Sequence, residues 1–177
     1  MTSTLDRRNI RMKLPDSMAT PRVTLVLQSL DAVRAWIGEL PAEVQKELSP
    51  LWLERLRQAT EPSPWICMFN VQRNSDNTEV GQCGFKGPPD ELGLVEIGYG
   101  IADAYQRQGL ATDAIAALLQ FAQRSGTILT VRAHTKQDNV ASRRVLEKNG
   151  FQSLGQFIDP EDGEVDRYEY HLATTTA

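Results

Sequence analysis

Residues 104–112, with the sequence AYQRQGLAT, have the composition and placement of an anion-binding loop. They lie between a strand-like run at 94–101 and a helix-like run at 109–124. A helix usually begins at a Ser, Thr, Asp or Asn whose side chain accepts a hydrogen bond from an exposed backbone amide. Residues 106–109, at the entry to this helix, include no such side chain. Because the exposed amides of a helix start carry about half a positive charge, the loop is predicted to bind an anion such as a phosphate.

Gly109 fits this prediction, because the absence of a side chain lets a phosphate approach the backbone closely. The simpler interpretation, which an isolated glycine favours, is that Gly109 only permits a tight turn. Two other phosphate-binding patterns are excluded. The dinucleotide pattern G-x-G-x-x-G fails because Gly98 and Gly100 lie within the strand and Asp103 takes the third place. Residues 81–89 lack the order of a Walker loop.

Glu96 is a candidate general base, because it is a carboxylate in an otherwise apolar strand, LVEIGYG. The alternation of side chains along a strand places it on the same face as Gly98 and Gly100, which leave space for a cofactor, a water or a substrate. An ion pair with an arginine on a neighbouring strand, such as Arg132, would explain the same carboxylate. From the residues alone both interpretations stay open.

The pattern of apolar residues predicts one α/β domain around these positions. Strands are expected at 22–28, 65–72, 79–86, 94–101, 128–135, 151–158 and 167–172. Helices are expected at 30–40, at 42–59 with a bend or break at Pro50, at 109–124 and at 139–149. Hairpins at both ends and a strand–helix–strand order in the middle predict a mixed sheet with a partly parallel centre and helices on its faces. We expect a flexible N-terminal segment at 1–20 and a single domain at 21–173.

The composition argues against several classes of protein. A formal net charge of −4 and the lack of a long Lys/Arg run argue against nucleic-acid binding. No apolar run approaches the ~20 residues of a membrane-spanning helix, so we expect a soluble, cytoplasmic protein. The basic N-terminal stretch leaves organelle targeting open as an alternative. Cys67 and Cys83 are expected to be reduced core residues, neither a disulfide nor part of a metal site.

Residues 106–111, QRQGLA, match the Q/R-x-x-G-x-G/A motif and resemble the GNAT superfamily of acyl-CoA-dependent N-acyltransferases. The preceding VEIGYGI and the later NVASRRVLEKNGF resemble, at the right separation, the strand and the second cofactor helix of that superfamily. The branch that the chain resembles most contains ribosomal-protein N-terminal acetyltransferases and many small-molecule acetyltransferases. The resemblance is most specific from Leu94 to Phe151. It implies a mixed, splayed, seven-stranded sheet with helices on both faces.

The resemblance also implies acetyl-CoA (coenzyme A) as co-substrate and no metal ion. In the superfamily, loop amides that match 108–112 bind the pyrophosphate, and the strand backbone that matches 99–101 pairs with pantetheine. Asn139 matches a position that hydrogen-bonds the pantetheine arm, and Ser142 on the same helical face is within reach of the thioester sulfur. The cofactor-binding residues so implied are Tyr99, Gly100, Ile101, Gln106, Arg107, Gln108, Gly109, Leu110, Ala111, Thr112, Asn139 and Ser142.

Acetyl transfer to an amine also requires proton transfer. A primary amine with a pKa near ~10 must lose a proton before it attacks, and a leaving thiolate with a pKa of roughly 8.5 is stabilised by a donor. With the resemblance, Glu96 becomes the expected base, acting through a water, and Ser142 the expected donor. Many superfamily members carry a tyrosine donor where this chain has Leu146, so a water or no donor at all are the alternatives to Ser142. Tyr105 is interpreted as a packing residue and His134 as structural or solvated.

The expected activity is transfer of an acetyl group from acetyl-CoA to a primary amine of a small molecule or a protein N terminus, by direct attack in a ternary complex. The acceptor pocket is expected between the early helices, with Trp36 and Trp52, and the acidic turn at 159–166, which either attracts a cationic amine or is solvated. The alternative function is a non-catalytic acyl-CoA-binding sensor with the same fold. No nucleic-acid or membrane partner is expected, and a homodimer is compatible with the sequence.

Overall fold

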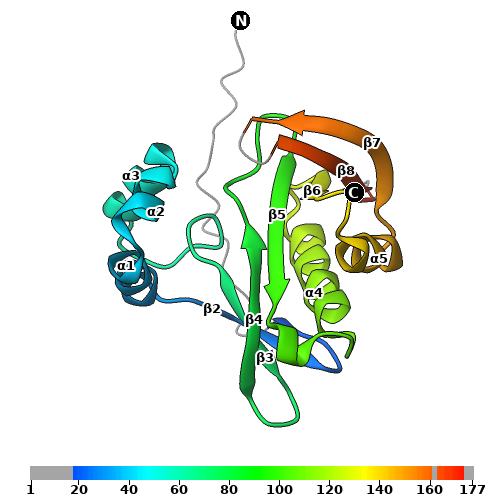
Figure 1. Cartoon of the computed structure of the whole chain (residues 1–177), viewed down its shortest axis with the longest axis horizontal. Coiled ribbons are helices and arrows are strands. Elements are labelled where there is room, and N and C mark those ends of the chain that lie inside the picture. Colours follow the sequence, from blue (N-terminus) through cyan, green and yellow to red (C-terminus); the bar gives the residue numbers. More distant parts are fainter. Residues whose placement is uncertain (1–17, 161–162, 174–177) are drawn as a thin grey trace, which may run out of the picture.

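The computed structural model describes residues 18–160 and 163–173, which form an eight-stranded mixed sheet with helices on both faces (Figure 1). The strand order is β1-β2-β3-β4-β5-β6-β8-β7. The strands are β1 (Met18–Ala19), β2 (Val23–Leu27), β3 (Phe69–Arg73), β4 (Thr78–Phe85), β5 (Leu94–Ile101), β6 (Thr130–Thr135), β7 (Gln152–Asp159) and β8 (Gly163–His171). The helices are α1 (Leu30–Glu39), α2 (Ala42–Glu47), α3 (Pro50–Gln58), α4 (Leu110–Ser125), α5 (Val140–Lys148) and the short 3₁₀ helix η1 (Asp103–Tyr105). The expected mixed α/β fold is confirmed.

Strand β1 corrects the expected N-terminal boundary. Met18 and Ala19 pair with Leu25 and Thr24 of β2, so the sheet has eight strands where seven were expected. The side chain of Met18 is buried in the main core, and burial of this apolar surface stabilises the short pairing. The expected flexible segment therefore does not extend to residue 20, and residues 1–17 lie outside the described part of the chain.

The helices begin and end close to the expected residues. The run at 42–59 is divided into α2 and α3, and Ser49 caps α3 by accepting a hydrogen bond from the backbone amide of Trp52. Helix α4 ends at Gly126, whose left-handed backbone (φ 65°) suits a residue without a side chain. Within the described ranges, no helix is both long and apolar enough to cross a membrane.

The sheet opens between β5 and β6, which pair in parallel. Their pairing covers Leu94–Ile97 and Thr130–Ala133, although β5 continues to Ile101 and β6 to Thr135. On its other side β5 stays paired with β4 as far as Ile101. The partly parallel, splayed centre is therefore present as expected. It leaves the edge of residues 98–101 that faces β6 open.

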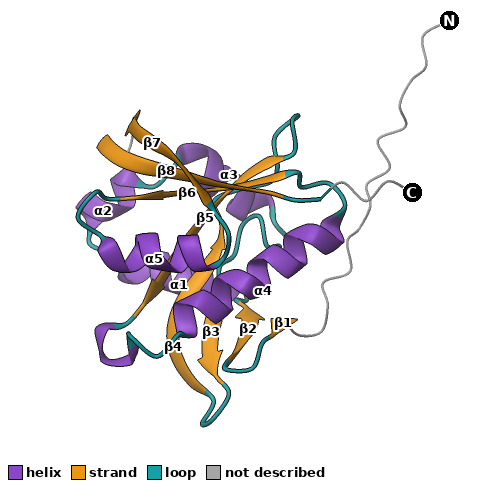
Figure 2. Cartoon of the chain, turned by 90° about the vertical axis from the view of Figure 1, so that its right-hand side faces the viewer, coloured by secondary structure: helices purple, strands orange, loops and turns teal. Residues whose placement is uncertain are grey.

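Two apolar clusters hold the helices against the sheet, and Figure 2 shows how these helices and the sheet are arranged. In the larger cluster, Ile115 and Leu118 of α4 and Leu146 of α5 pack on strand residues such as Val95 and Val131. The smaller cluster, which joins α1 and α3 to the chain before β3, consists of Leu30, Val33, Leu56 and Cys67. Helices α4 and α5 therefore cover one face of the sheet, and α1 to α3 lie toward the other.

The two cysteines are buried free thiols, as expected. Burial raises the pKa of Cys67 and of Cys83. Because the thiolate is the reactive form, neither residue has the character of a catalytic nucleophile.

Leu146 provides a test of how α5 is anchored, because its side chain is fully buried and is the buried residue of that helix. We expect Leu146→Ala to lower the free energy of unfolding by about 2–5 kcal/mol, through lost apolar contact and the cavity left behind. Leu154→Ala removes the same atoms from an exposed residue of β7 and should change stability by less than about 0.5 kcal/mol. Urea denaturation of both variants checks this, and equal losses would contradict the packing described.

Candidate active site

Helix α4 begins without a side-chain cap. The residue just before the helix, Gly109, has a left-handed backbone (φ 78°), and no side chain in the described part of the chain accepts a hydrogen bond from the helix start. By contrast, Ser29, Ser49 and Asn139 cap α1, α3 and α5 with their side-chain oxygens. The predicted uncapped start is confirmed as a structural feature, and binding of a pyrophosphate to its amides stays a prediction.

The loop before α4 is held in an uncommon conformation. The side-chain nitrogen of Gln106 donates to the backbone oxygen of Ile101 (3.0 Å) and to Oδ1 of Asp103 (2.8 Å). Arg107 adopts a left-handed backbone (φ 62°), which is uncommon for a residue with a side chain. Such backbone conformations concentrate at binding sites. The side chain of Gln106, expected to contact the cofactor, is thus engaged within the protein and fixes the loop to the end of β5.

Arg22 is a neighbour of this loop that sequence reasoning missed. A Cβ atom on Gly109 would lie only 2.5 Å from Nη1 of Arg22. The same nitrogen donates to Oδ1 of Asp113, in the first turn of α4, at 3.0 Å. Residue 22 is distant in the sequence, and only the packing of β2 beside α4 brings its guanidinium to the helix start.

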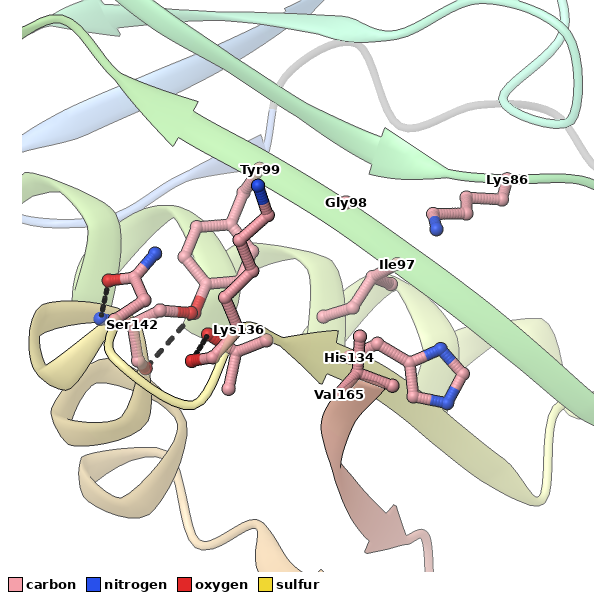
Figure 3. Close-up of a pocket in the computed structure, with 10 residues that line it drawn as sticks. Lys86, Ile97, Gly98, Tyr99, His134, Lys136, Ser142 and Val165 are labelled. Carbon is pink, nitrogen blue, oxygen red and sulfur yellow. Dashed lines mark hydrogen bonds between the residues drawn. The ribbon is translucent and has the colours of Figure 1, made fainter. Parts of the chain in front are cut away.

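A cavity of about 270 Å³ lies where β5 and β6 separate (Figure 3). It is lined by Lys86, Ile97, Gly98, Tyr99, His134, Thr135, Lys136, Asn139, Ser142 and Val165. Of the predicted site residues, Tyr99, Asn139 and Ser142 line this cavity. Glu96, residues 100–101 and the loop at 106–112 lie outside its lining, and Glu96 reaches it only through its partners Lys86 and His134. The structure therefore separates the candidate pyrophosphate loop from the candidate reaction site along β5.

Two hydroxyl groups meet at one end of the cavity (Figure 3). Oη of Tyr99 lies 2.8 Å from Oγ of Ser142 and 3.2 Å from the backbone oxygen of Ser142, and its one hydrogen can be donated to either oxygen. Asn139 caps α5 by accepting a hydrogen bond from the amide of Ser142 (3.0 Å), so its oxygen is engaged within the protein. Burial raises the pKa of Tyr99, which keeps the phenol protonated. The sequence suggested only a backbone role for Tyr99, and its side chain was missed.

Glu96 forms an ion pair, but not with the expected partner. Its Oε1 lies 2.6 Å from Nζ of Lys86, whereas Arg132 binds Glu169 at 2.6 Å. The ion pair that the sequence analysis offered as an alternative for Glu96 is therefore present, but the predicted partner, Arg132, is wrong. A Cβ on Gly98 would meet its nearest neighbour, Cε of Lys86, at 3.8 Å. The expected open space beside Glu96 is present.

His134 lies beside Glu96 and was missed by sequence reasoning, which treated it as structural or solvated. Its Nδ1 is 3.3 Å from Oε1 of Glu96 and 3.6 Å from Oδ2 of Asp159. Its Nε2 accepts a hydrogen bond from Nε of Arg167 (3.1 Å). Because arginine can only donate, the neutral imidazole carries its proton on Nδ1, which faces the two carboxylates. The parallel register of β5 and β6 could have indicated this contact, since His134 follows the partner of Glu96 by two residues.

The expected acceptor pocket differs from the cavity observed. Trp36 is exposed on α1, and the indole nitrogen of Trp52 donates to the backbone oxygen of Ile66 at 3.0 Å. Neither tryptophan lines the cavity. In the acidic turn, Asp159 lies near His134, while Glu161 and Asp162 fall outside the described residues.

A comparison with protein families decides the classification. The sequence model of the acetyltransferase (GNAT) domain matches residues 15–152 of the chain, which include the candidate loop and the cavity residues up to Ser142. The chain belongs to the GNAT acetyltransferase family. The resemblance inferred from QRQGLA and its flanking motifs is therefore confirmed.

Two bacterial N-acetyltransferases are similar to parts of this GNAT chain. YjdG of Bacillus subtilis (strain 168) is 39% identical over 77 residues, which are 43% of this chain and 46% of that protein. The protein p20 of Bacillus licheniformis is 26% identical over 107 residues, or 59% of this chain and 60% of that protein. The chain thus spans about half the length of the curated relatives that it matches.

Solved GNAT structures share the fold. RimL, a ribosomal L7/L12 alpha-N-protein acetyltransferase in complex with coenzyme A, has a TM-score of 0.65 and 19% identity, over 90% of this chain and 99% of that one. The aminoglycoside acetyltransferase AAC(6')-Ib, in complex with coenzyme A, has a TM-score of 0.60 and 15% identity, over 84% and 94%. At this identity the likeness shows the fold alone. The different acceptors in these names mean that the fold does not identify the acceptor for this GNAT chain.

The open face beside Glu96 can be tested with two glycines of this GNAT domain. A Cβ on Gly98 meets only ordinary contacts, whereas a Cβ on Gly81 would lie 2.1 Å from the backbone oxygen of Gly100. We expect Gly98→Val to leave the Tm almost unchanged and to slow amine acetylation about tenfold or more, because the side chain fills the reaction space. Gly81→Val should lower the Tm strongly. A normal rate for Gly98→Val would show that the cavity is not the reaction site.

Proposed function

We propose that this GNAT domain transfers an acetyl group from acetyl-CoA to a primary amine by direct attack in a ternary complex. The observation that carries the proposal is the cavity at the opening of β5 and β6. Tyr99 and Ser142 lie at one end of it and Lys86 and His134, the partners of Glu96, at the other (Figure 3). Hydroxyl donors and a carboxylate acceptor are the groups that acyl transfer to an amine requires.

The described residues fit acetyl-CoA as co-substrate. The uncapped start of α4 supplies backbone amides for the pyrophosphate, and Gly109 keeps side-chain atoms away from them. The open edge of residues 99–101 can pair with the amide groups of pantetheine in the manner of an added strand. Because the oxygen of Asn139 caps α5, its amide nitrogen is the part of that side chain we assign to the pantetheine arm.

In the proposed reaction, Glu96 accepts the proton that the amine loses, directly or through a water. The amine nitrogen forms a bond to the acetyl carbon, and the bond from that carbon to sulfur breaks. The electron pair leaves with the sulfur as a thiolate, which the hydroxyl of Ser142 stabilises by donating a hydrogen bond. Oε1 of Glu96 is shielded from solvent and faces Nζ of Lys86 and Nδ1 of His134, so we assign the amine proton to the other carboxylate oxygen of Glu96.

The acceptor is a primary amine of a small molecule or of a protein N terminus. It approaches along the face of β5 that carries Glu96, where Gly98 and Gly100 leave room. RimL and AAC(6')-Ib, named for a protein alpha-amine and for aminoglycosides, support both acceptor classes. A panel of amines assayed for thiol release from acetyl-CoA tests the reaction. Binding of acetyl-CoA without release in any mixture would instead favour the non-catalytic sensor.

Acetyl-CoA at ~100 times its dissociation constant should stabilise the wild-type fold by roughly 2.7 kcal/mol. We expect Gly109→Ala to lose this gain, because a side chain at the uncapped helix start blocks the pyrophosphate and displaces Arg22. Gly126→Ala is the matched control, since Gly126 at the other end of α4 is also left-handed and has open space around it. Both variants have similar backbone strain. In thermal denaturation, only Gly126→Ala should still be stabilised by acetyl-CoA. Equal gains would exclude the loop as the pyrophosphate site.

Glu96→Gln preserves the shape of the side chain but removes the basic oxygen, so turnover should fall by roughly 10²- to 10⁴-fold. Stabilisation by acetyl-CoA should persist, which separates a catalytic loss from unfolding. Glu169→Gln breaks the buried ion pair with Arg132 and is the control: it should lower stability and leave the turnover of folded protein nearly unchanged. Full activity of Glu96→Gln would assign the proton to water or to the substrate.

A further inference from the structure

We propose that Tyr99 is a positioning residue whose phenol turns the hydroxyl proton of Ser142 toward the leaving thiolate. This inference rests on the proposed acetyl transfer. Its basis is the pair of contacts from Oη of Tyr99, at 2.8 Å to Oγ and 3.2 Å to the backbone oxygen of Ser142, at the wall of the cavity (Figure 3).

The backbones on both sides of this contact are fixed. Tyr99 is paired with Cys83 of β4, and its ring packs against the main core. Ser142 lies in the first turn of α5, where its amide is bound by the cap Asn139. The positions of the two hydroxyl oxygens are therefore largely fixed by the backbone, and only the orientation of their hydrogens can change.

Two hydrogen arrangements fit the distances. In the first, Tyr99 donates to Oγ of Ser142, and the serine proton points into the cavity. In the second, Tyr99 donates to the backbone oxygen, and the serine proton is engaged by Oη. A thiolate in the cavity selects the first arrangement, because a hydrogen bond from Ser142 to an anion is stronger than one to a neutral phenol. Donation by Tyr99 also polarises the serine hydroxyl and strengthens its bond to sulfur.

The pair stabilises the thiolate without giving up a proton. Burial raises the pKa of Tyr99 above its ordinary value of about 10, whereas a thiol has a pKa near ~8.5. Transfer of the phenolic proton to the sulfur is therefore unfavourable. The thiolate leaves as an anion held by a hydrogen bond and takes its proton from water. For the same reason, loss of the Tyr99 proton should not lower turnover until the pH exceeds about 10.

Two hydroxyl deletions and their combination test the inference. We expect Tyr99→Phe to lower kcat about three- to tenfold and Ser142→Ala about ten- to a hundredfold, with stabilisation by acetyl-CoA unchanged in both. Because Tyr99 acts through Ser142, the double variant should be no slower than Ser142→Ala. Tyr170→Phe removes the same atom from a partly buried tyrosine of β8 outside the cavity and should leave kcat unchanged. An unchanged or raised kcat in Tyr99→Phe, or multiplied losses in the double variant, would overturn the inference.

A second measurement is independent of the acceptor. The pKa of the thiol of bound coenzyme A can be followed by the ultraviolet absorbance of its thiolate. Both single variants should raise this pKa relative to the wild type, because each weakens the hydrogen bond to the anion. Cys67 and Cys83 do not interfere, since burial raises the pKa of both. Equal thiol pKa values in wild type and Tyr99→Phe would overturn the inference, whereas shifted values with no acetylated amine would refute only the proposed function.

Discussion

The end of the parallel pairing between β5 and β6 is the constraint on which the rest of the site depends. Both strands continue beyond Ile97 and Ala133, but they are no longer paired with each other. Backbone amide and carbonyl groups at such an opening require other partners. A pantetheine arm can provide them as an added strand would. The same opening gives Ser142, at the start of α5, access to the space beside Tyr99.

The alternation of side chains along β5 separates the two tasks of the proposed reaction. Ile97 and Tyr99 lie on the face that packs against α4 and α5, and Glu96 and Gly98 lie on the other. A thioester in the opening between β5 and β6 is then approached by the amine from one side and releases its thiolate toward the other. This separation keeps the carboxylate and the developing thiolate apart, which reduces the repulsion between them.

Features that depend on residues close together in the chain could be predicted from the sequence. Features that depend on which strands are neighbours, and on which residues pair across them, came only from the structure. The uncapped start of α4 and its glycine follow from residue types alone, and so does the isolated carboxylate Glu96. The contacts of Glu96 with Lys86 and His134 required knowledge of which strands are neighbours, so Arg132 was chosen wrongly. The two-residue strand at Met18 was too short to show a period, and only its burial against β2 reveals it.

The anchoring of α5 explains why, in the proposed reaction, a tyrosine on the strand that acts through Ser142 suits this chain. The helix has nine residues, and such a short helix depends on packing for its position. Leu146 supplies that packing and is fully buried. A tyrosine at position 146 would have two possible placements. Inside the apolar core, its hydroxyl would lose its hydrogen bonds to water. Outside the core, α5 would lose the packing that Leu146 provides. Tyr99 avoids this conflict, because β5 is held by backbone hydrogen bonds to β4 and its phenol can reach Ser142 while Leu146 remains in the core.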